Sequence, residues 1–216
     1  MASPKVSART QNDEAEERLY GGLTSSARRE QRRERLIAAG FRLFGTKGFE
    51  DTSIEALCAE AGVGIRAFYD EFGSRDAVFT AAFFEVADAA FSKLQADLIA
   101  TDGTPLPDRL QSALSVYLHY ILDDPRRARL TAVDTPRGDM ELAAKRIEFT
   151  DRFAKLAEAA VASGGDRPEG NLAYWSVMVV GGVQGLIAYW MNADPRPEID
   201  DLASEAARFL LRSLGA

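Results

Sequence analysis

Residues 52–79 read TSIEALCAEAGVGIRAFYDEFGSRDAVF, and this stretch decides the fold. Thr52 followed by Glu55 is a capping-box pattern, which predicts that a helix begins here. Gly62 suits the left-handed position just past the end of that helix. A second short helix follows, and Ser74 is placed to cap a longer third one. The apolar positions of the first helix share one face: Ile54, Leu57, Cys58 and Ala61.

Two short helices joined by a tight glycine turn form a helix-turn-helix pattern, in which the second helix enters the major groove of DNA. We expect Ile65, Phe68 and Phe72 to anchor that second helix. Arg66 is then held outward, where it can reach guanine or phosphate. Gly64 leaves backbone N–H groups open to a phosphate. The alternative is that Arg66 pairs with Asp70, four residues further on.

The helix predicted before this stretch, Ala27 to Gly45, has two faces. Ile37, Gly40, Phe41 and Phe44 form its apolar stripe, and a basic stripe is predicted to face away from the core: Arg28, Arg32, Arg35 and Arg42. Residues 25–48 contain seven basic and two acidic residues, whereas residues 76–216 contain 14 basic and 21 acidic ones. This asymmetry favours a nucleic-acid-binding head on an acidic body.

The remaining chain predicts helices and no strands. Residues 1–25 are polar and aperiodic, which predicts a mobile tail. After them we expect an all-α protein, with a helix-turn-helix DNA-binding domain over 26–74 and a larger helical bundle over 75–216 that binds effector and dimerises. Its predicted helices cover about 75–100, 107–123, 125–134, 137–163, 170–192 and 199–214.

Composition bears on other classes of function. One cysteine and one histidine allow no internal disulfide and no common zinc site, so neither a metal nor a cofactor is expected. His119 lies in no catalytic motif, and no phosphate-binding glycine loop is present, which argues against an enzyme. The N-terminus lacks the apolar core of a signal peptide, so we expect a cytoplasmic protein.

Five spaced motifs resemble those of the TetR family of bacterial transcriptional regulators. They are LF-x-x-x-G at the end of the helix predicted over Ala27 to Gly45, T-S before the next helix, A-G-V in the turn, F-Y-x-x-F in the recognition helix, and S-R at the start of the helix that follows. The resemblance covers about residues 27–85. It implies contacts to bases and phosphates by Thr52, Gly64, Ile65, Arg66, Ala67 and Tyr69, with Arg75 on a phosphate. From its basic stripe we add Arg28 as a phosphate contact. Asp70 or Glu71 could accept from a cytosine amino group.

The body holds one long uncharged stretch, residues 171–193. By length it could span a bilayer, so a membrane-associated or purely dimerising protein is the alternative to a regulator. Ser176 and Gln184 interrupt the stretch and no basic cluster flanks it, which favours a buried helix in a soluble protein. The resemblance implies that the last two helices form a dimer interface, supplied by Gly181, Gly182, Gly185, Leu202, Ala206, Phe209 and Leu210.

Aromatic residues of the body are candidates for an effector pocket, because apolar walls with a few polar tips suit a small molecule. The candidates are Tyr117, Tyr120, Phe149, Phe153, Tyr174, Trp175 and Met178. With the resemblance, they predict a ligand-responsive repressor. Its partners would be a palindromic double-stranded DNA operator, a second copy of the chain, and a small apolar or amphipathic effector.

Overall fold

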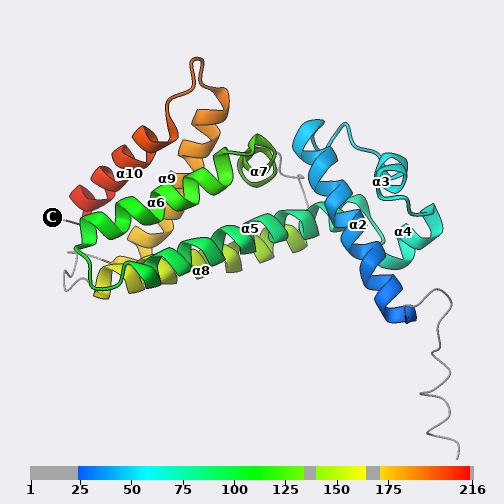
Figure 1. Ribbon diagram of the computed structural model, residues 1–216, viewed down its shortest axis with the longest axis horizontal. Helices are drawn as coiled ribbons and strands as arrows, with labels where there is room; N and C mark the ends of the chain where they lie inside the picture. The colour runs from blue at the N-terminus through cyan, green and yellow to red at the C-terminus, as the bar shows by residue number, and fades with distance from the viewer. Residues whose placement is uncertain (1–23, 134–139, 164–170, 215–216) are drawn as a thin grey trace, which may run out of the picture.

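The computed structural model describes residues 24–133, 140–163 and 171–214, and within these ranges every regular element is a helix (Figure 1). The expected all-α class is therefore confirmed. The elements are α2 (Ser25–Thr46), α3 (Ile54–Ala61), α4 (Ile65–Glu71), α5 (Arg75–Ala100), α6 (Leu106–Leu122), α7 (Pro125–Ala128), η1 (Arg129–Val133), α8 (Met140–Ser163), α9 (Leu172–Asn192) and α10 (Ile199–Ser213).

Helix boundaries fall close to the predicted ones. Helix α2 begins at Ser25, two residues before the expected start, because the Thr24 side chain caps it by accepting from the backbone N–H of Ala27. The predicted tail is thus wrong for residue 25, and residues 1–23 lie outside the described residues. The first three residues of the helix predicted over 137–163 also lie outside them.

The head consists of α2, α3 and α4 packed against the first turns of α5 (Figure 1). Its core contains the rings of Phe44, Phe49 and Phe79, whose centroids lie 5.3–5.6 Å apart. Phe44 and Phe79 are fully buried, and edge and tilted contacts of this kind suit the charge distribution of aromatic rings. Because Phe79 belongs to α5, the same helix that begins the body also completes the core of the head.

A short connection after α6 joins the body to the head. The helix predicted over 125–134 is instead a four-residue α-helix, α7, followed by the π-helical turn η1. Arg129 in η1 donates from Nη1 to the carbonyl of Thr46 over 2.8 Å and from Nη2 to that of Lys47 over 3.3 Å. These carbonyls end α2, where unpaired acceptors attract a cation. Arg129 therefore fastens η1 to the head.

The body is a bundle in which α8 lies along α5 and α10 packs on α6 (Figure 1). Arg109 of α6 is buried, and its guanidinium donates to the carbonyls of Leu98 and Ala160, both over 3.3 Å. It thereby joins the last turns of α5 and α8 to α6. Among the described residues, no helix combines the length and apolar character that a bilayer crossing needs, and α9 is included in that finding.

Candidate functional site

The turn between α3 and α4 has the predicted helix-turn-helix geometry. Gly62 ends α3 in the left-handed region, with φ of 60°, as expected. The N-cap of α3, however, is Ser53, whose hydroxyl accepts from the N–H of Ala56. The capping role predicted for Thr52 is therefore wrong. Thr52 is fully buried and its hydroxyl donates to the carbonyl of Gly48 over 2.7 Å, so it offers no surface to DNA.

Helix α4 has one buried face and one exposed face. Phe68 is fully buried, and Ala67 and Phe72 pack partly against the same core. Ile65 and Tyr69, which are one helical turn apart, are 50% and 54% exposed. The expectation that Ile65 anchors the helix is wrong, because its side chain leaves the first turn on the solvent side. Ile65 and Tyr69 instead form an exposed apolar edge on α4.

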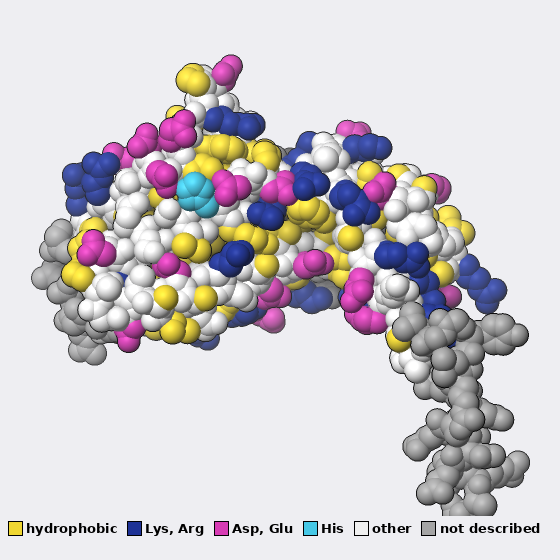
Figure 2. All heavy atoms as spheres, in the orientation of Figure 1, with side chains coloured by type: hydrophobic (Ala, Val, Ile, Leu, Met, Phe, Trp, Pro, Cys, Tyr) yellow, Lys and Arg dark blue, Asp and Glu magenta, His cyan; other side chains and the backbone are white. Residues whose placement is uncertain are grey.

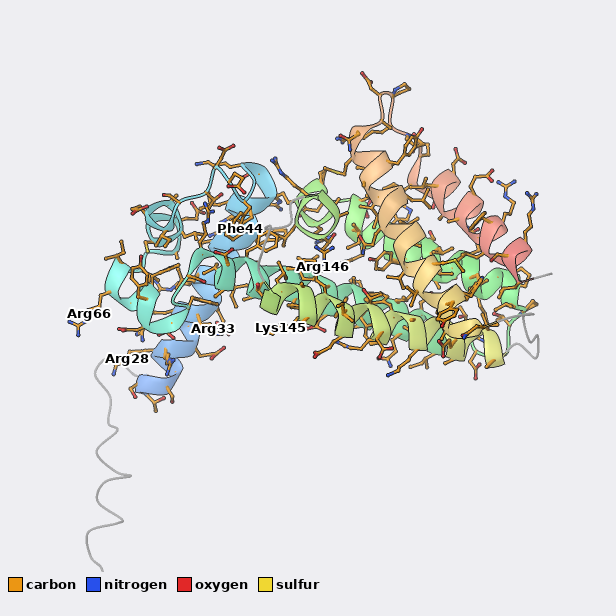
Figure 3. The ribbon with its side chains drawn as sticks, turned by 180° about the vertical axis from the view of Figure 1, so that it is seen from behind. Arg28, Arg33, Phe44, Arg66, Lys145 and Arg146 are labelled. Atoms are coloured by element: carbon orange, nitrogen blue, oxygen red, sulfur yellow. The ribbon has the colours of Figure 1, made fainter. Side chains whose placement is uncertain are left out.

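Arg66 extends from this exposed side, away from the head (Figure 3). It makes no hydrogen bond or ion pair with any other residue that the structure describes, so the alternative pair with Asp70 is not formed. Gly64, directly before α4, faces open space, since a Cβ added there would meet no heavy atom within 4 Å. The start of α4 is thus open to a large partner.

Other arginines of the head are committed to its own structure. Arg29 and Arg32 of α2 each approach the carboxylate of Glu71 to 2.9 Å, and the Glu71 side chain is only 2% exposed. Burial alone would raise the pKa of Glu71, but the hydrogen bonds from both arginines outweigh it and hold the pKa below its ordinary value. The basic stripe of α2 therefore does not face wholly away from the core. Glu71 is also not placed to accept from cytosine.

Arg75, at the start of α5, has a structural role that the sequence did not indicate. Its Nη1 donates to the carbonyl of Thr52 over 3.0 Å and lies 3.5 Å from that of Glu50. Its guanidinium stacks on the ring of Phe49, 4.0 Å from the centroid. A phosphate contact by Arg75 would compete with these bonds. Arg28 is exposed in the first turn of α2 (Figure 3).

A cavity of about 140 Å³ lies in the body between α5, α6, α8 and α9. Four of the predicted pocket residues line it: Tyr117, Phe149, Phe153 and Trp175. The prediction is wrong for the other three. Tyr174 and Met178 are 71% and 66% exposed on the outer face of α9, and Tyr120 packs outside the cavity under the guanidinium of Arg127.

Few polar groups reach this cavity. The Gln184 amide donates to the hydroxyl of Tyr117 over 3.4 Å, while its Oε1 is buried without a partner among the described residues. Burial raises the pKa of Tyr117 to about 12, although this hydrogen bond opposes the rise. Arg146 lies at the end of the cavity nearest the head, with its guanidinium 5.2 Å from the ring centroid of Phe83.

The predicted dimer residues divide into two groups. Gly181, Gly182 and Gly185 are exposed on α9, and a Cβ at any of them would meet nothing within 4 Å. Phe209 of α10 is 70% exposed and lines the groove between the two helices together with Gly182. The other three are buried within the chain, because they lie on the face of α10 that packs inward: Leu202, Ala206 and Leu210.

Comparison with known proteins decides what the head is. Residues 36–82, from within α2 to the first turns of α5, match the model of a family described as bacterial regulatory proteins, tetR family. Over these residues the head is therefore similar to tetR-family regulators. Its match to an uncharacterized HTH-type transcriptional regulator of Bacillus subtilis, YerO, is 38% identical over 52 residues. That match covers 24% of this chain and 18% of YerO, so it relates only a short part of the two chains.

Solved structures of TetR-family regulators and their relatives share the whole fold. A regulator from Rhodococcus superposes with a TM-score of 0.72 at 21% identity, covering 85% of this chain and 98% of that one. FadR from Bacillus subtilis, solved in complex with stearoyl-CoA, gives a TM-score of 0.71 at 15% identity and covers 83% and 98% of the two chains. The family and these neighbours are transcription regulators rather than enzymes.

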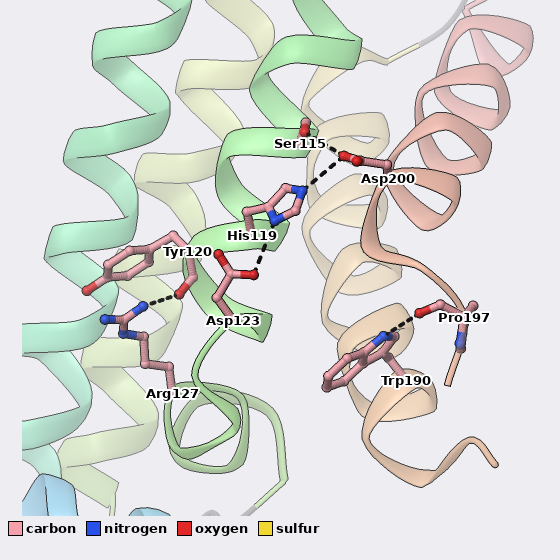
Figure 4. Close-up of polar contacts among 8 residues, drawn as sticks. All are labelled: Ser115, His119, Tyr120, Asp123, Arg127, Trp190, Pro197 and Asp200. Carbon is pink, nitrogen blue, oxygen red and sulfur yellow. Dashed lines mark hydrogen bonds and ion pairs between the residues drawn. The ribbon is translucent and has the colours of Figure 1, made fainter. Parts of the chain in front are cut away.

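The single histidine of the chain is part of a polar link that the sequence did not reveal (Figure 4). His119 of α6 contacts Asp200 of α10 over 2.9 Å and Asp123 over 3.2 Å. The hydrogen bond to Asp200, and then that to Asp123, raise the pKa of His119. Asp200 is 81 residues distant in sequence, so no local pattern could have paired them.

Proposed function

We propose that the protein is a ligand-responsive repressor that binds a palindromic operator as a dimer and is released by an apolar or amphipathic effector. The observation that carries the DNA part is Arg66, which stands exposed between Ile65 and Tyr69 while Arg29, Arg32 and Arg75 are held by groups of the head. Such a regulator would act in the cytoplasm, where the chromosome is reached.

Base reading by Arg66 has a direct test. If Arg66 contacts guanine, Arg66→Ala should cost about 1–3 kcal/mol on the operator and relax specificity at one symmetric pair of positions. Arg28→Ala should weaken binding to operator and random DNA alike, because phosphate contacts carry no sequence information. Arg208→Ala is the control, since Arg208 lies in α10 of the body and pairs with Glu205. Titrations at two salt concentrations separate these cases, and unchanged operator binding by Arg66→Ala contradicts the proposal.

Dimerisation is supported by the outer face of α9. Tyr174, Val177, Met178 and Tyr189 are all more than half exposed, and no charged residue lies anywhere in α9. An uncharged apolar face of this kind suits a second protein surface. Gly181→Leu with Gly185→Leu should weaken the dimer without disturbing the monomer, because a Cβ at either position would meet no described residue within 4 Å. Light scattering that finds the variant as dimeric as the parent would place the interface elsewhere.

Release by an effector is supported by the position of η1. Thr131 lines the cavity, and Arg129 in the same π-helical turn holds the last carbonyls of α2. A ligand that shifts Thr131 therefore acts on the element fastened to the head. The stearoyl-CoA complex of FadR supports the effector class. We expect Arg129→Met to leave effector binding intact but to reduce the change in operator affinity that the effector causes.

A further inference from the structure

The cavity of the body is small, and several aromatic rings line it. They belong to Phe83, Tyr117, Phe149, Phe153 and Trp175. The ring centroid of Phe153 is 5.7 Å from that of Tyr117 and 4.9 Å from that of Phe149. An apolar cavity of about 150 Å³ holds one molecule of the size of benzene, and the cavity of the body measures about 140 Å³. Its volume therefore suits a single six-membered ring.

Two polar side chains of the lining, Tyr117 and Gln184, have hydrogen-bonding capacity to spare. The Gln184 amide donates to the hydroxyl of Tyr117 over 3.4 Å. Among the described residues nothing accepts the Tyr117 hydroxyl proton, and nothing donates to the buried Oε1 of Gln184. Burial raises the pKa of Tyr117 to about 12, so its hydroxyl keeps its proton at neutral pH and can donate it. The pair therefore offers one unused donor and one unused acceptor.

Other polar groups of the lining already have partners. The hydroxyl of Thr131 donates to the carbonyl of Arg127 over 2.8 Å. The guanidinium of Arg146 lies over an aromatic ring of the lining, and Arg146 has a further interaction of its own. A buried acceptor without a donor is costly, so a ligand gains stability by bonding to Gln184 and to its neighbour Tyr117.

A hydroxyl group is the simplest complement to this pair, because its oxygen accepts a hydrogen bond and its hydrogen donates one. An ether oxygen would serve only the donor, Tyr117, and a methyl group would serve neither residue. An aromatic ring also suits the walls, since edge-to-face contacts with Phe149 and Phe153 add to the gain from burying its apolar surface. The volume and the polar pair thus select for the same small molecule.

We propose that the cavity binds a compact phenol, a single aromatic ring that carries a hydroxyl group. The ligand hydroxyl accepts from the hydroxyl of Tyr117 and donates to Oε1 of Gln184, while its ring packs among the aromatic walls. The ligand is neutral and makes no use of the arginine in the lining. This inference rests on the proposed function only for its effect on DNA, since binding to the cavity can be measured by itself.

Five probes test the inference by calorimetry on the full-length protein. Phenol can make both hydrogen bonds, anisole only the one from Tyr117, and toluene neither. We expect phenol to bind about fivefold more tightly than anisole, and anisole about fivefold more tightly than toluene, because each step adds one neutral hydrogen bond. Cyclohexanol keeps the hydroxyl but lacks the aromatic ring, so it should bind severalfold more weakly than phenol. Decanoic acid is too long for the cavity and should not bind.

Variants assign these differences to residues. Tyr117→Phe should remove the preference for anisole over toluene, and Gln184→Met, which keeps the side-chain size, should remove the preference for phenol over anisole. Both variants should still bind toluene, which shows that the cavity is intact. Tyr120→Phe is the matched control for the first, because Tyr120 packs outside the cavity under the guanidinium of Arg127 (Figure 4). Gln111→Met is the control for the second, since Gln111 also lies outside the lining.

Three results would overturn the inference. The first is that phenol does not bind to the parent protein, or binds no more tightly than toluene, so that the polar pair meets no ligand hydroxyl. The second is equal binding of cyclohexanol and phenol, which would remove the aromatic ring from the ligand class. The third is tight binding of decanoic acid. If protein with any of these results still binds DNA, the regulator stands and only the ligand class is wrong. Failure to bind DNA, with phenol bound as expected, would contradict the proposed function alone.

Discussion

The head and the body both have aromatic cores, but only one of them is closed. In the head, Phe44, Phe49 and Phe79 contact one another ring to ring. In the body, the ring of Phe153 contacts those of Tyr117 and Phe149, yet all three rings border the cavity. The same residue types therefore have different roles in the head and in the body. In the head they pack against one another, whereas in the body part of each ring faces a cavity.

The largest expected effect tests this contrast directly. Phe44→Ala should cost about 3–5 kcal/mol of unfolding free energy, because a fully buried ring leaves a cavity that its neighbours cannot fill. Phe153→Ala should cost less than half as much, since its ring already borders a void. Urea denaturation of both variants provides the measurement. Equal losses would mean that the body is packed as tightly as the head and would remove the contrast.

Each region also contains a buried charged side chain, and that of the body, Arg109, should be the more costly to remove. Arg109 donates to the carbonyls of both Leu98 and Ala160, two residues that line the cavity. We expect Arg109→Leu to cost about 2–3 kcal/mol, because it leaves buried acceptors unpaired. Chemical denaturation gives the value. Hydrogen exchange should show the loosening first at the C-terminal ends of α5 and α8, and uniform loosening would contradict this assignment.

The buried charged side chain of the head is Glu71. We expect its ion pairs with Arg29 and Arg32 to contribute about 1–2 kcal/mol to the free energy of unfolding, and this contribution should depend on pH. Its pKa is held below the ordinary value, so its contribution is present above the unfolded pKa of about 4.3. The contribution disappears as the pH falls through the folded pKa. Glu71→Gln should therefore be less stable than the parent at neutral pH and should approach it under more acidic conditions. A constant difference at all pH values would contradict the ion-pair account.

The smallest expected effect concerns His119, which links α6 to α10 (Figure 4) and is the cyan side chain seen at the surface in Figure 2. Its pKa is raised, so the link is fully formed below the unfolded pKa of about 6.5 and is lost as the pH rises through the folded pKa. His119→Asn should lower the melting temperature slightly near pH ~6 and not at all under alkaline conditions. The opposite pH trend would show that the neutral ring makes the link.

Local signals in the sequence predicted the helices and the turn well, whereas distant contacts could not be predicted. Hydrophobic periodicity placed α5 and α10 almost to the residue, and Gly62 marked the turn because left-handed backbone favours glycine. A capping pattern shifted by one residue misplaced the role of Thr52. The partners of Glu71 are 39 and 42 residues away, beyond any local pattern.

The functional site was predicted in part for a similar reason. Periodicity shows that a residue lies on a face, but it does not show whether that face meets another helix, a cavity or solvent. The row Leu202, Ala206 and Leu210 therefore looked like an interface and proved to be core. Tyr174 looked like a pocket wall and proved to be on the surface. A cavity such as the one in the body forms where several helices leave space unfilled between them. No single segment of the sequence encodes it.

The close packing of the head against α7 depends on the absence of a side chain at position 45. Gly45, in the last turn of α2, is buried against α7, and a Cβ at this position would lie 2.5 Å from the Cβ of Arg126 and 3.1 Å from its Cα. Any side chain at position 45 must therefore act as a wedge. A series from glycine through alanine to valine would separate the two units in graded steps without any effector. Operator affinity measured along that series would show how far the head can be displaced before DNA binding is lost.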